Sequence, residues 1–228
     1  MKAIVQDRYG PPETLTLADV DTPVPAPDEV LVRVEAASLN AYDWHAMRGD
    51  PLIARLAMGR SRPRARIRGR DFAGRVEAVG AEVRQVRPGD AVGGDLGDAN
   101  GAFAEYACVP ETLVAPRPAN LTPQQAAALP LAGVTALMGL CDVGRVGPGC
   151  RVLVNGASGG VGTLAVQLAR ALRATVTGVC STRNVDLVGS LGADHVVDYT
   201  RHDFTRDTRR HDLVFDLVGN RSLAALRR

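Results

Sequence analysis

The sequence has few cysteines, and their spacing excludes the commonest sites built from that residue. Its cysteines stand at positions 108, 141, 150 and 180 of a 228-residue chain. None has the close Cys-x-x-Cys spacing that a structural zinc site requires. A disulfide framework is not expected in a chain of this size without a secretory signal. We therefore expect small core cysteines and no bound metal.

Charge of one sign and long apolar runs are missing as well. The net charge of +2 is too balanced to indicate a nucleic-acid or anionic-membrane partner. The longest nearly apolar stretch, residues 126–141, is interrupted by Pro130 and is too short to cross a bilayer. We expect it to form a buried helix. No basic segment followed by an apolar one opens the chain, which favours a cytoplasmic protein with a small-molecule substrate.

The most informative segment is Arg151-Val-Leu-Val-Asn-Gly-Ala-Ser-Gly-Gly-Val-Gly162, a β-branched run that enters a glycine turn and a helix over residues 163–172. Glycines at 156, 159 and 162 allow a sharp turn, close approach to a pyrophosphate and tight helix packing. The helix N-terminus offers unpaired N–H groups to an anion. An ordinary strand-to-helix turn is the alternative, but apolar residues on both sides favour a dinucleotide site. The expected cofactor-binding residues here are Asn155, Gly156, Ser158, Gly159, Gly160, Val161 and Gly162.

The end of the next strand, expected over residues 174–180, indicates which dinucleotide binds. An NAD site usually has an acidic residue about 20 residues past the turn, where it bonds the ribose 2′-hydroxyl. This sequence has Ser181, Thr182 and Arg183 there instead, which favours the 2′-phosphate of NADP(H). The alternative is that Arg183 is one more exposed arginine among many.

Turn-forming residues divide the chain near positions 116–123. The part before them contains short strands broken by proline and glycine, whereas the part after them alternates strands with helices, as in a parallel sheet. We predict an α/β protein with a β-rich domain over residues 1–118 and a dinucleotide-binding domain over 119–228. The expected strands cover residues 3–6, 30–37, 75–79, 91–92, 103–109, 151–155, 174–180, 195–198 and 212–218.

One arginine-rich segment calls for a separate interpretation. Residues 60–70 carry an arginine at every second position, so an extended chain would place all of them on one face. A nucleic-acid contact would need such a face, but no aromatic residues accompany it. A solvated surface is the favoured interpretation.

Six motifs occur in the order found in one enzyme family. They are Leu39-Asn-Ala-Tyr-Asp43, Gly69-Arg-Asp-Phe-Ala-Gly74, Val86-Arg-Pro-Gly-Asp90, Gly101-Ala-Phe-Ala-Glu-Tyr106, Leu131-Ala-Gly-Val-Thr-Ala136 and the glycine turn. Together they resemble the medium-chain dehydrogenases/reductases, most closely the zinc-independent quinone oxidoreductase (zeta-crystallin-like) branch. The resemblance covers essentially the whole chain. It implies a GroES-like catalytic domain followed by a Rossmann domain, with the active site in the cleft between them.

Departures from the zinc-dependent branch of that family bear on the chemistry. Asn40 stands where those alcohol dehydrogenases have a cysteine ligand, and Gly-Arg-Asp71 stands where they have Gly-His-Glu. Without a Lewis acid the site is poorly suited to alcohol oxidation. We expect NADPH-dependent reduction of a quinone or an α,β-unsaturated carbonyl, in which hydrogen bonds stabilise the developing charge on oxygen.

The resemblance also suggests site residues. Asn40 is the expected donor to the substrate carbonyl, Tyr42 is the next candidate and His45 the weakest, because a lone histidine is more often a surface residue. Asp43 more simply bonds local backbone. Thr135 matches a threonine near the nicotinamide, with a hydrogen bond to its own helix as the alternative. Tyr199 matches a position close to the adenosine phosphate.

The sequence ends soon after residues 212–219, where the family continues with further βα units. A complete doubly wound domain has six strands. We therefore expect a chain cut short at its C-terminus, with weak NADPH binding and reduced turnover. The alternatives are a non-catalytic nucleotide-binding fragment and a zinc-free alcohol dehydrogenase-like protein. A homo-oligomer is in doubt because the usual dimer edge would be missing.

Overall fold

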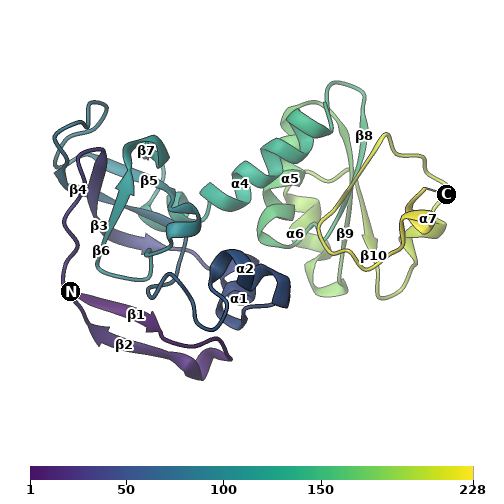
Figure 1. The fold of residues 1–228 in the computed structure, drawn as a ribbon. Helices are drawn as coiled ribbons and strands as arrows, with labels where there is room; N and C mark the ends of the chain where they lie inside the picture. The colour runs from purple at the N-terminus through teal and green to yellow at the C-terminus, as the bar shows by residue number, and fades with distance from the viewer. Residues whose placement is uncertain (228) are drawn as a thin grey trace. The chain divides into compact units, whose positions relative to one another are not determined.

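The computed structural model describes residues 1–227, which form two compact units (Figure 1). Unit 1 is Met1–Leu131 and unit 2 is Ala132–Arg228. The expected division between residues 118 and 119 stays a prediction. Unit 1 is rich in strands and unit 2 alternates strands with helices, so the predicted order of a β-rich part and a parallel α/β part is confirmed.

Unit 1 is built on a five-stranded antiparallel sheet with the order β6-β3-β4-β5-β7. Its strands are β3 (Glu29–Ala37), β4 (Asp71–Val79), β5 (Ala91–Asp95), β6 (Tyr106–Pro110) and β7 (Val114–Pro116). Alternating apolar residues line its buried face, where Val32 of β3 pairs with Val76 of β4 and Phe72 is fully buried. β1 (Lys2–Gln6) and β2 (Leu15–Asp19) form a separate antiparallel pair. The sequence did not predict β2 or β7.

Short helices connect the strands of unit 1. They are η1 (Pro12–Thr14), α1 (Ala41–Arg48), η2 (Leu52–Ala54), α2 (Arg55–Met58), η3 (Gly97–Ala99), η4 (Glu111–Leu113) and α3 (Pro123–Ala127). α1 begins after Asn40, whose backbone N–H donates to Asp43 Oδ2 at 2.7 Å, and it ends at Gly49 with a φ of 64°. The local role expected for Asp43 is thus confirmed.

The buried helix expected over residues 126–141 is wrong as a single element. α3 ends at Ala127, a new helix α4 (Pro130–Leu137) begins at Pro130, and a π-helical turn η5 (Met138–Val143) follows. Proline has no N–H to donate back into the preceding turn, so the helix cannot run through position 130. Burial is also one-sided, because Val134 and Leu137 are exposed.

Unit 2 contains a four-stranded parallel sheet with the order β10-β9-β8-β11. Its elements are β8 (Arg151–Asn155), α5 (Gly160–Ala171), β9 (Thr175–Cys180), η6 (Thr182–Asn184), α6 (Val185–Ser190), β10 (His195–Asp198), η7 (Phe204–Arg206), β11 (Leu213–Asp216) and α7 (Leu223–Leu226). α5 and α6 cover one face, while η7 and α7 lie over the other (Figure 1). The near-continuous apolar character of β8 and β9 matches burial on both faces.

The strand order of this sheet marks a ligand-binding position. The chain goes from β8 through β9 to β10, and then returns to β11 on the other side of β8. Open parallel sheets bind ligands at such a switch point, outside the carboxyl ends of the strands. The glycine turn follows β8 at this point.

The arginine-rich segment is not the wholly solvated face that the sequence predicted. Arg60, Arg62, Arg64 and Arg66 are exposed, but Arg68 is only 3% exposed. Ile67 pairs with Val5 of β1 as an isolated bridge, and the next residue in the sequence, Arg68, is buried.

Candidate functional site

The glycine turn of unit 2 has the backbone that a pyrophosphate site requires. Gly156 has a φ of 87°, which favours glycine. A Cβ at Gly162 would lie 2.1 Å from the Gly156 carbonyl oxygen, so only glycine lets α5 start this close to the turn. At Gly160 a Cβ would meet no atom within 4 Å, so open space adjoins the first turn of α5, whose N–H groups no helix carbonyl can accept. These features fit the diphosphate of a dinucleotide.

Asn155 connects the two strands at the switch point. It ends β8, is 2% exposed, and its Nδ2 donates to Asp216 Oδ1 at 2.8 Å and to Asn220 Oδ1 at 3.1 Å. These bonds join the carboxyl end of β8 to the end of β11 and the loop after it. Asn155 therefore shapes the site from beneath, and its direct contact with a cofactor stays a prediction.

Asn184 links the two segments that the sequence assigned to the cofactor. Its Nδ2 donates to Ser158 Oγ in the glycine turn at 3.0 Å and to Ser181 Oγ after β9 at 3.3 Å. Sequence reasoning missed Asn184, and only its position three residues after Ser181 could have suggested it. Arg183 lies on η6, between Ser181 and Asn184 in the sequence. Its side chain is exposed and makes no hydrogen bond or ion pair within residues 1–227. A guanidinium in that position is available to an anion.

The end of β10 brings a carboxylate to the same edge. Asp198 Oδ2 accepts a hydrogen bond from Thr182 Oγ1 at 2.5 Å, and its Oδ1 accepts one from Thr200 Oγ1 at 2.7 Å. Both hydrogen bonds lower the pKa of Asp198. Thr182, one of the hydroxyls expected near a 2′-phosphate, is thus committed to Asp198. Tyr199 is half exposed, and its N–H donates to the Cys180 carbonyl at 3.1 Å, which holds it beside the end of β9. Thr135 lies exposed on α4.

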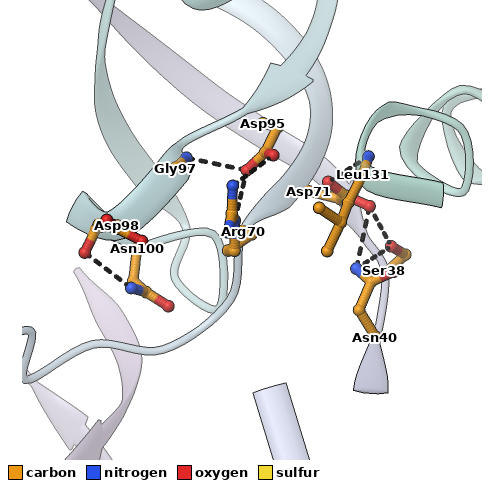
Figure 2. Close-up of polar contacts among 9 residues, drawn as sticks. All are labelled: Ser38, Asn40, Arg70, Asp71, Asp95, Gly97, Asp98, Asn100 and Leu131. Carbon is orange, nitrogen blue, oxygen red and sulfur yellow. Dashed lines mark hydrogen bonds and ion pairs between the residues drawn. The ribbon is translucent and has the colours of Figure 1, made fainter. Parts of the chain in front are cut away.

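In unit 1 a buried carboxylate holds Asn40. Asp71 is fully buried; its Oδ2 accepts from Asn40 Nδ2 at 3.0 Å and from Ser38 Oγ at 3.1 Å, and its Oδ1 accepts from the Leu131 N–H at 3.0 Å. Figure 2 shows Asp71 facing these three partners. The Asn40 amide is therefore fixed in orientation by β4. The sequence noted Asp71 only as a departure from a metal-binding pattern.

A second buried carboxylate lies close to the first. Burial raises the pKa of both Asp43 and Asp71, and the charge of Asp71 raises that of Asp43 further. Asp43 Oδ1 is buried and has no hydrogen-bond partner within residues 1–227. The region around Asn40 is thus acidic and poorly hydrated.

Tyr42 and His45 lie on α1 and differ in their surroundings. His45 is exposed. Tyr42 is half-buried under the guanidinium of Arg70, 4.7 Å from its ring centre, and lines a cavity of about 520 Å³ within unit 1. Arg70 in turn forms a two-point ion pair with Asp95, with both N–O distances at 2.7 Å (Figure 2). The structure therefore associates Tyr42 with a cavity, whereas the role of His45 stays a prediction.

The part of the chain that the structure describes has no group of three or more His, Cys, Asp or Glu side chains that could hold a metal ion. All four cysteines are free, and Cys180 alone is fully buried. Over the same residues no helix has the length and apolar character needed to cross a membrane.

Comparison with known proteins agrees with this fold. The model of the alcohol dehydrogenase GroES-like domain matches residues 26–119, and that of the zinc-binding dehydrogenase matches residues 160–227. The quinone oxidoreductase structure from Coxiella burnetii is 38% identical, superimposes with a TM-score of 0.88, and is matched over 96% of this chain and 69% of its own. The chain therefore belongs to the medium-chain dehydrogenase/reductase family. The predicted resemblance to its quinone oxidoreductase branch is confirmed.

Two curated relatives have names that describe their reactions. Quinone-oxidoreductase QR1 of Triphysaria versicolor is 40% identical over 87% of this chain and 61% of its own length. The NADPH-dependent alkenal/one oxidoreductase of Arabidopsis thaliana is 35% identical over 96% of this chain and 58% of its own. The chain thus spans about three fifths of the length of these relatives.

Proposed function

We propose that the protein is an NADPH-dependent oxidoreductase that reduces quinones or α,β-unsaturated carbonyl compounds without zinc. The observation that carries this proposal is the glycine turn at the switch point, in a chain whose relatives are named as quinone and alkenal/one oxidoreductases. A cytoplasmic location and small-molecule substrates remain part of the proposal.

Each unit contributes a different part of this activity. Backbone N–H groups at Gly160, Val161 and Gly162 would receive the pyrophosphate, and Arg183 with Ser181 would receive the 2′-phosphate. Bound NADPH would supply the hydride. The Asn40 amide donates to Asp71 at 3.0 Å and, over a longer distance, to Ser38 at 3.4 Å; it would exchange the Ser38 hydrogen bond for one to the acceptor oxygen as negative charge develops there. Thr135 and Tyr199 are proposed contacts at the nicotinamide and adenosine ends.

The proposal of zinc-free chemistry is supported by the residues around Asn40. Asp71 already accepts three hydrogen bonds, and its neighbour in the sequence, Arg70, is paired with Asp95. A quinone or enone accepts a hydride without Lewis-acid activation of an alcohol, so this donor set is sufficient. We expect a chelator to leave the activity unchanged and elemental analysis to find no stoichiometric zinc.

The decisive experiment compares cofactor binding in two arginine variants. Fluorescence titration of the wild type should give tighter binding of NADPH than of NADH. Arg183→Ala should reduce that preference by about 10- to 100-fold, because a charge-assisted hydrogen bond contributes about 1.5–3 kcal/mol. Arg206→Ala, an exposed arginine on η7, is the matched control and should leave the preference intact. An unchanged ratio in Arg183→Ala would remove the basis for NADP(H).

NADPH oxidation in the presence of a simple quinone tests turnover separately. Steady oxidation that depends on the quinone supports the reductase. Tight NADPH binding without oxidation of NADPH by quinones or enones would favour the second candidate, a non-catalytic nucleotide-binding protein. The second candidate is kept because the switch-point site lies wholly within unit 2.

A further inference from the structure

Arg68 is a buried cation without a counter-ion. Its side chain lies between β1 and α1, where its Nε donates to Gln6 Oε1 at 2.6 Å. Its Nη2 is buried and has no hydrogen-bond partner within residues 1–227, and no carboxylate of those residues lies at ion-pair distance. Burial lowers the pKa of Arg68, and the charge of Asp43 opposes this only from beyond ion-pair distance.

Neighbouring arginines show that this arrangement is unusual for the chain. Arg66 pairs with Asp7 at 2.7 Å, and Arg70 pairs with Asp95 at 2.7 Å. Both have some contact with solvent, whereas Arg68 has almost none. A buried charge is strongly unfavourable unless it is paired. Of these three arginines, the most buried one is thus the one without a carboxylate partner.

A cavity of about 520 Å³ adjoins this guanidinium. Its lining includes an apolar wall from η2 and α2, and polar groups from three other segments. Asn100 is 6% exposed, and its Oδ1 is buried without a hydrogen-bond partner among the described residues. Tyr42 also lines the cavity, and its hydroxyl forms no hydrogen bond within residues 1–227. The full lining is Tyr42, Ala54, Ala57, Met58, Arg64, Ala65, Arg68, Asp98 and Asn100.

We propose that this cavity binds an apolar small molecule that carries a carboxylate, and that Arg68 receives that carboxylate. The apolar wall accepts the body of the ligand, and the guanidinium gains the planar anion that its donor geometry fits. This inference rests on the proposed function: the preferred hydride acceptor is a quinone or enone that carries a carboxylate. Tyr42 would then donate to a second oxygen of the same molecule.

Other charges around the cavity do not oppose this assignment. Arg64 is exposed at the lining and adds positive charge. Asp98 also contributes to the lining, but it is exposed, so water screens its repulsion. Asp43 does not line the cavity. A ligand anion would therefore meet one buried cation, one exposed cation and one exposed anion.

Binding without cofactor tests the site. Isothermal titration calorimetry of the full chain should give a Kd for cinnamate about 10- to 100-fold lower than that for cinnamamide, its neutral analogue of the same shape. Arg68→Met should abolish this preference, while Arg60→Met, an exposed arginine of the same segment, should preserve it. Equal affinity for the two probes, or an unchanged preference in Arg68→Met, overturns the proposal.

A second variant guards against misfolding of Arg68→Met, which leaves Gln6 Oε1 without its donor. Asn100→Asp keeps the shape of the side chain and suits the positive φ of 57° at this position. Its added carboxylate should compete for Arg68 and weaken cinnamate binding at least about tenfold. Cinnamate binding as tight as in the wild type would contradict the assignment.

Turnover distinguishes this inference from the proposed function. With NADPH present, a carboxylated naphthoquinone should have a lower KM than its methyl ester, and the difference should vanish in Arg68→Met. Cinnamate binding without reduction of any quinone would support the carboxylate site and contradict the reductase function. Quinone reduction with equal KM values for the acid and the ester would support the reductase function and contradict the carboxylate site.

Discussion

The two units bury polar groups in different ways. Among the described residues, unit 1 buries the side chains of Gln6, Asp43, Arg68, Asp71 and Asn100, whereas unit 2 buries only those of Asn155 and Thr177. The buried side-chain atoms without a hydrogen-bond partner also lie in unit 1: Asp43 Oδ1, Arg68 Nη2, Asn100 Oδ1 and Arg117 Nε. The candidate site of unit 2 combines backbone N–H groups with half-buried Ser158 and Ser181 and the exposed Arg183.

This difference separates two kinds of binding. Backbone N–H groups at a helix terminus recognise a feature that every dinucleotide shares, so unit 2 needs an accurate turn and little side-chain chemistry. Buried charges with unsatisfied atoms lower stability, and they are retained where a ligand or a developing charge meets them. Unit 1 is therefore the part in which selectivity for the acceptor is expected.

The largest effect should come from breaking the turn in unit 2. Gly162→Ala places a Cβ 2.1 Å from the Gly156 carbonyl oxygen, a backbone atom that cannot easily move. We expect a loss of about 1–3 kcal/mol in the free energy of unfolding and a loss of NADPH binding. Thermal unfolding and fluorescence titration measure the two effects.

Gly189→Ala is the matched control for that variant. Gly189 lies in α6 of the same unit, and a Cβ there would meet no atom within 4 Å. Alanine should raise stability by up to about 1 kcal/mol through its higher helix propensity and leave NADPH binding unchanged. A Gly162→Ala variant as stable and as tightly binding as Gly189→Ala would show that the turn is not held by close packing.

The next effect should come from removing the acceptor in unit 1. Asp71→Ala leaves Ser38, Asn40 and the Leu131 N–H without their shared carboxylate. We expect a loss of about 1–3 kcal/mol in unfolding free energy, and a fall in kcat for quinone reduction larger than any rise in KM. Asp19→Ala breaks the exposed ion pair with Lys2 and should lower stability by only about 0–1 kcal/mol. Equal losses in both variants would contradict the special role of Asp71.

The smallest effect concerns pH. Burial raises the pKa of Asp43 above its ordinary value of 3.8, so the folded state holds this proton more tightly than the unfolded state. The contribution of Asp43 to stability therefore falls as pH rises through the window above 3.8. Asp43→Asn removes this contribution. The free energy of unfolding of Asp43→Asn, measured in urea, should decline less between about pH 4 and pH 7 than that of the wild type. Equal declines in the two proteins would contradict a raised pKa at Asp43.

Local sequence patterns predicted much of the architecture. All strands except β2 and β7, the glycine turn and the hydroxyl-rich end of β9 are encoded within a few consecutive residues, by apolar periodicity and by glycine. The same locality explains one error, because apolar character over residues 126–141 hid the break that Pro130 imposes between α3 and α4.

What the sequence by itself determined is the glycine turn at residues 156–162, on which the proposed dinucleotide site rests, since steric limits on backbone conformation act within neighbouring residues. Only the tertiary structure decided which charges are buried. Arg68 meets Gln6 from 62 positions away, and Asp71 meets Asn40 from 31 positions away. Such pairs form when strands distant in the chain share a sheet or a bridge, and the alternating arginines of residues 60–70 carry no sign of which one turns inward.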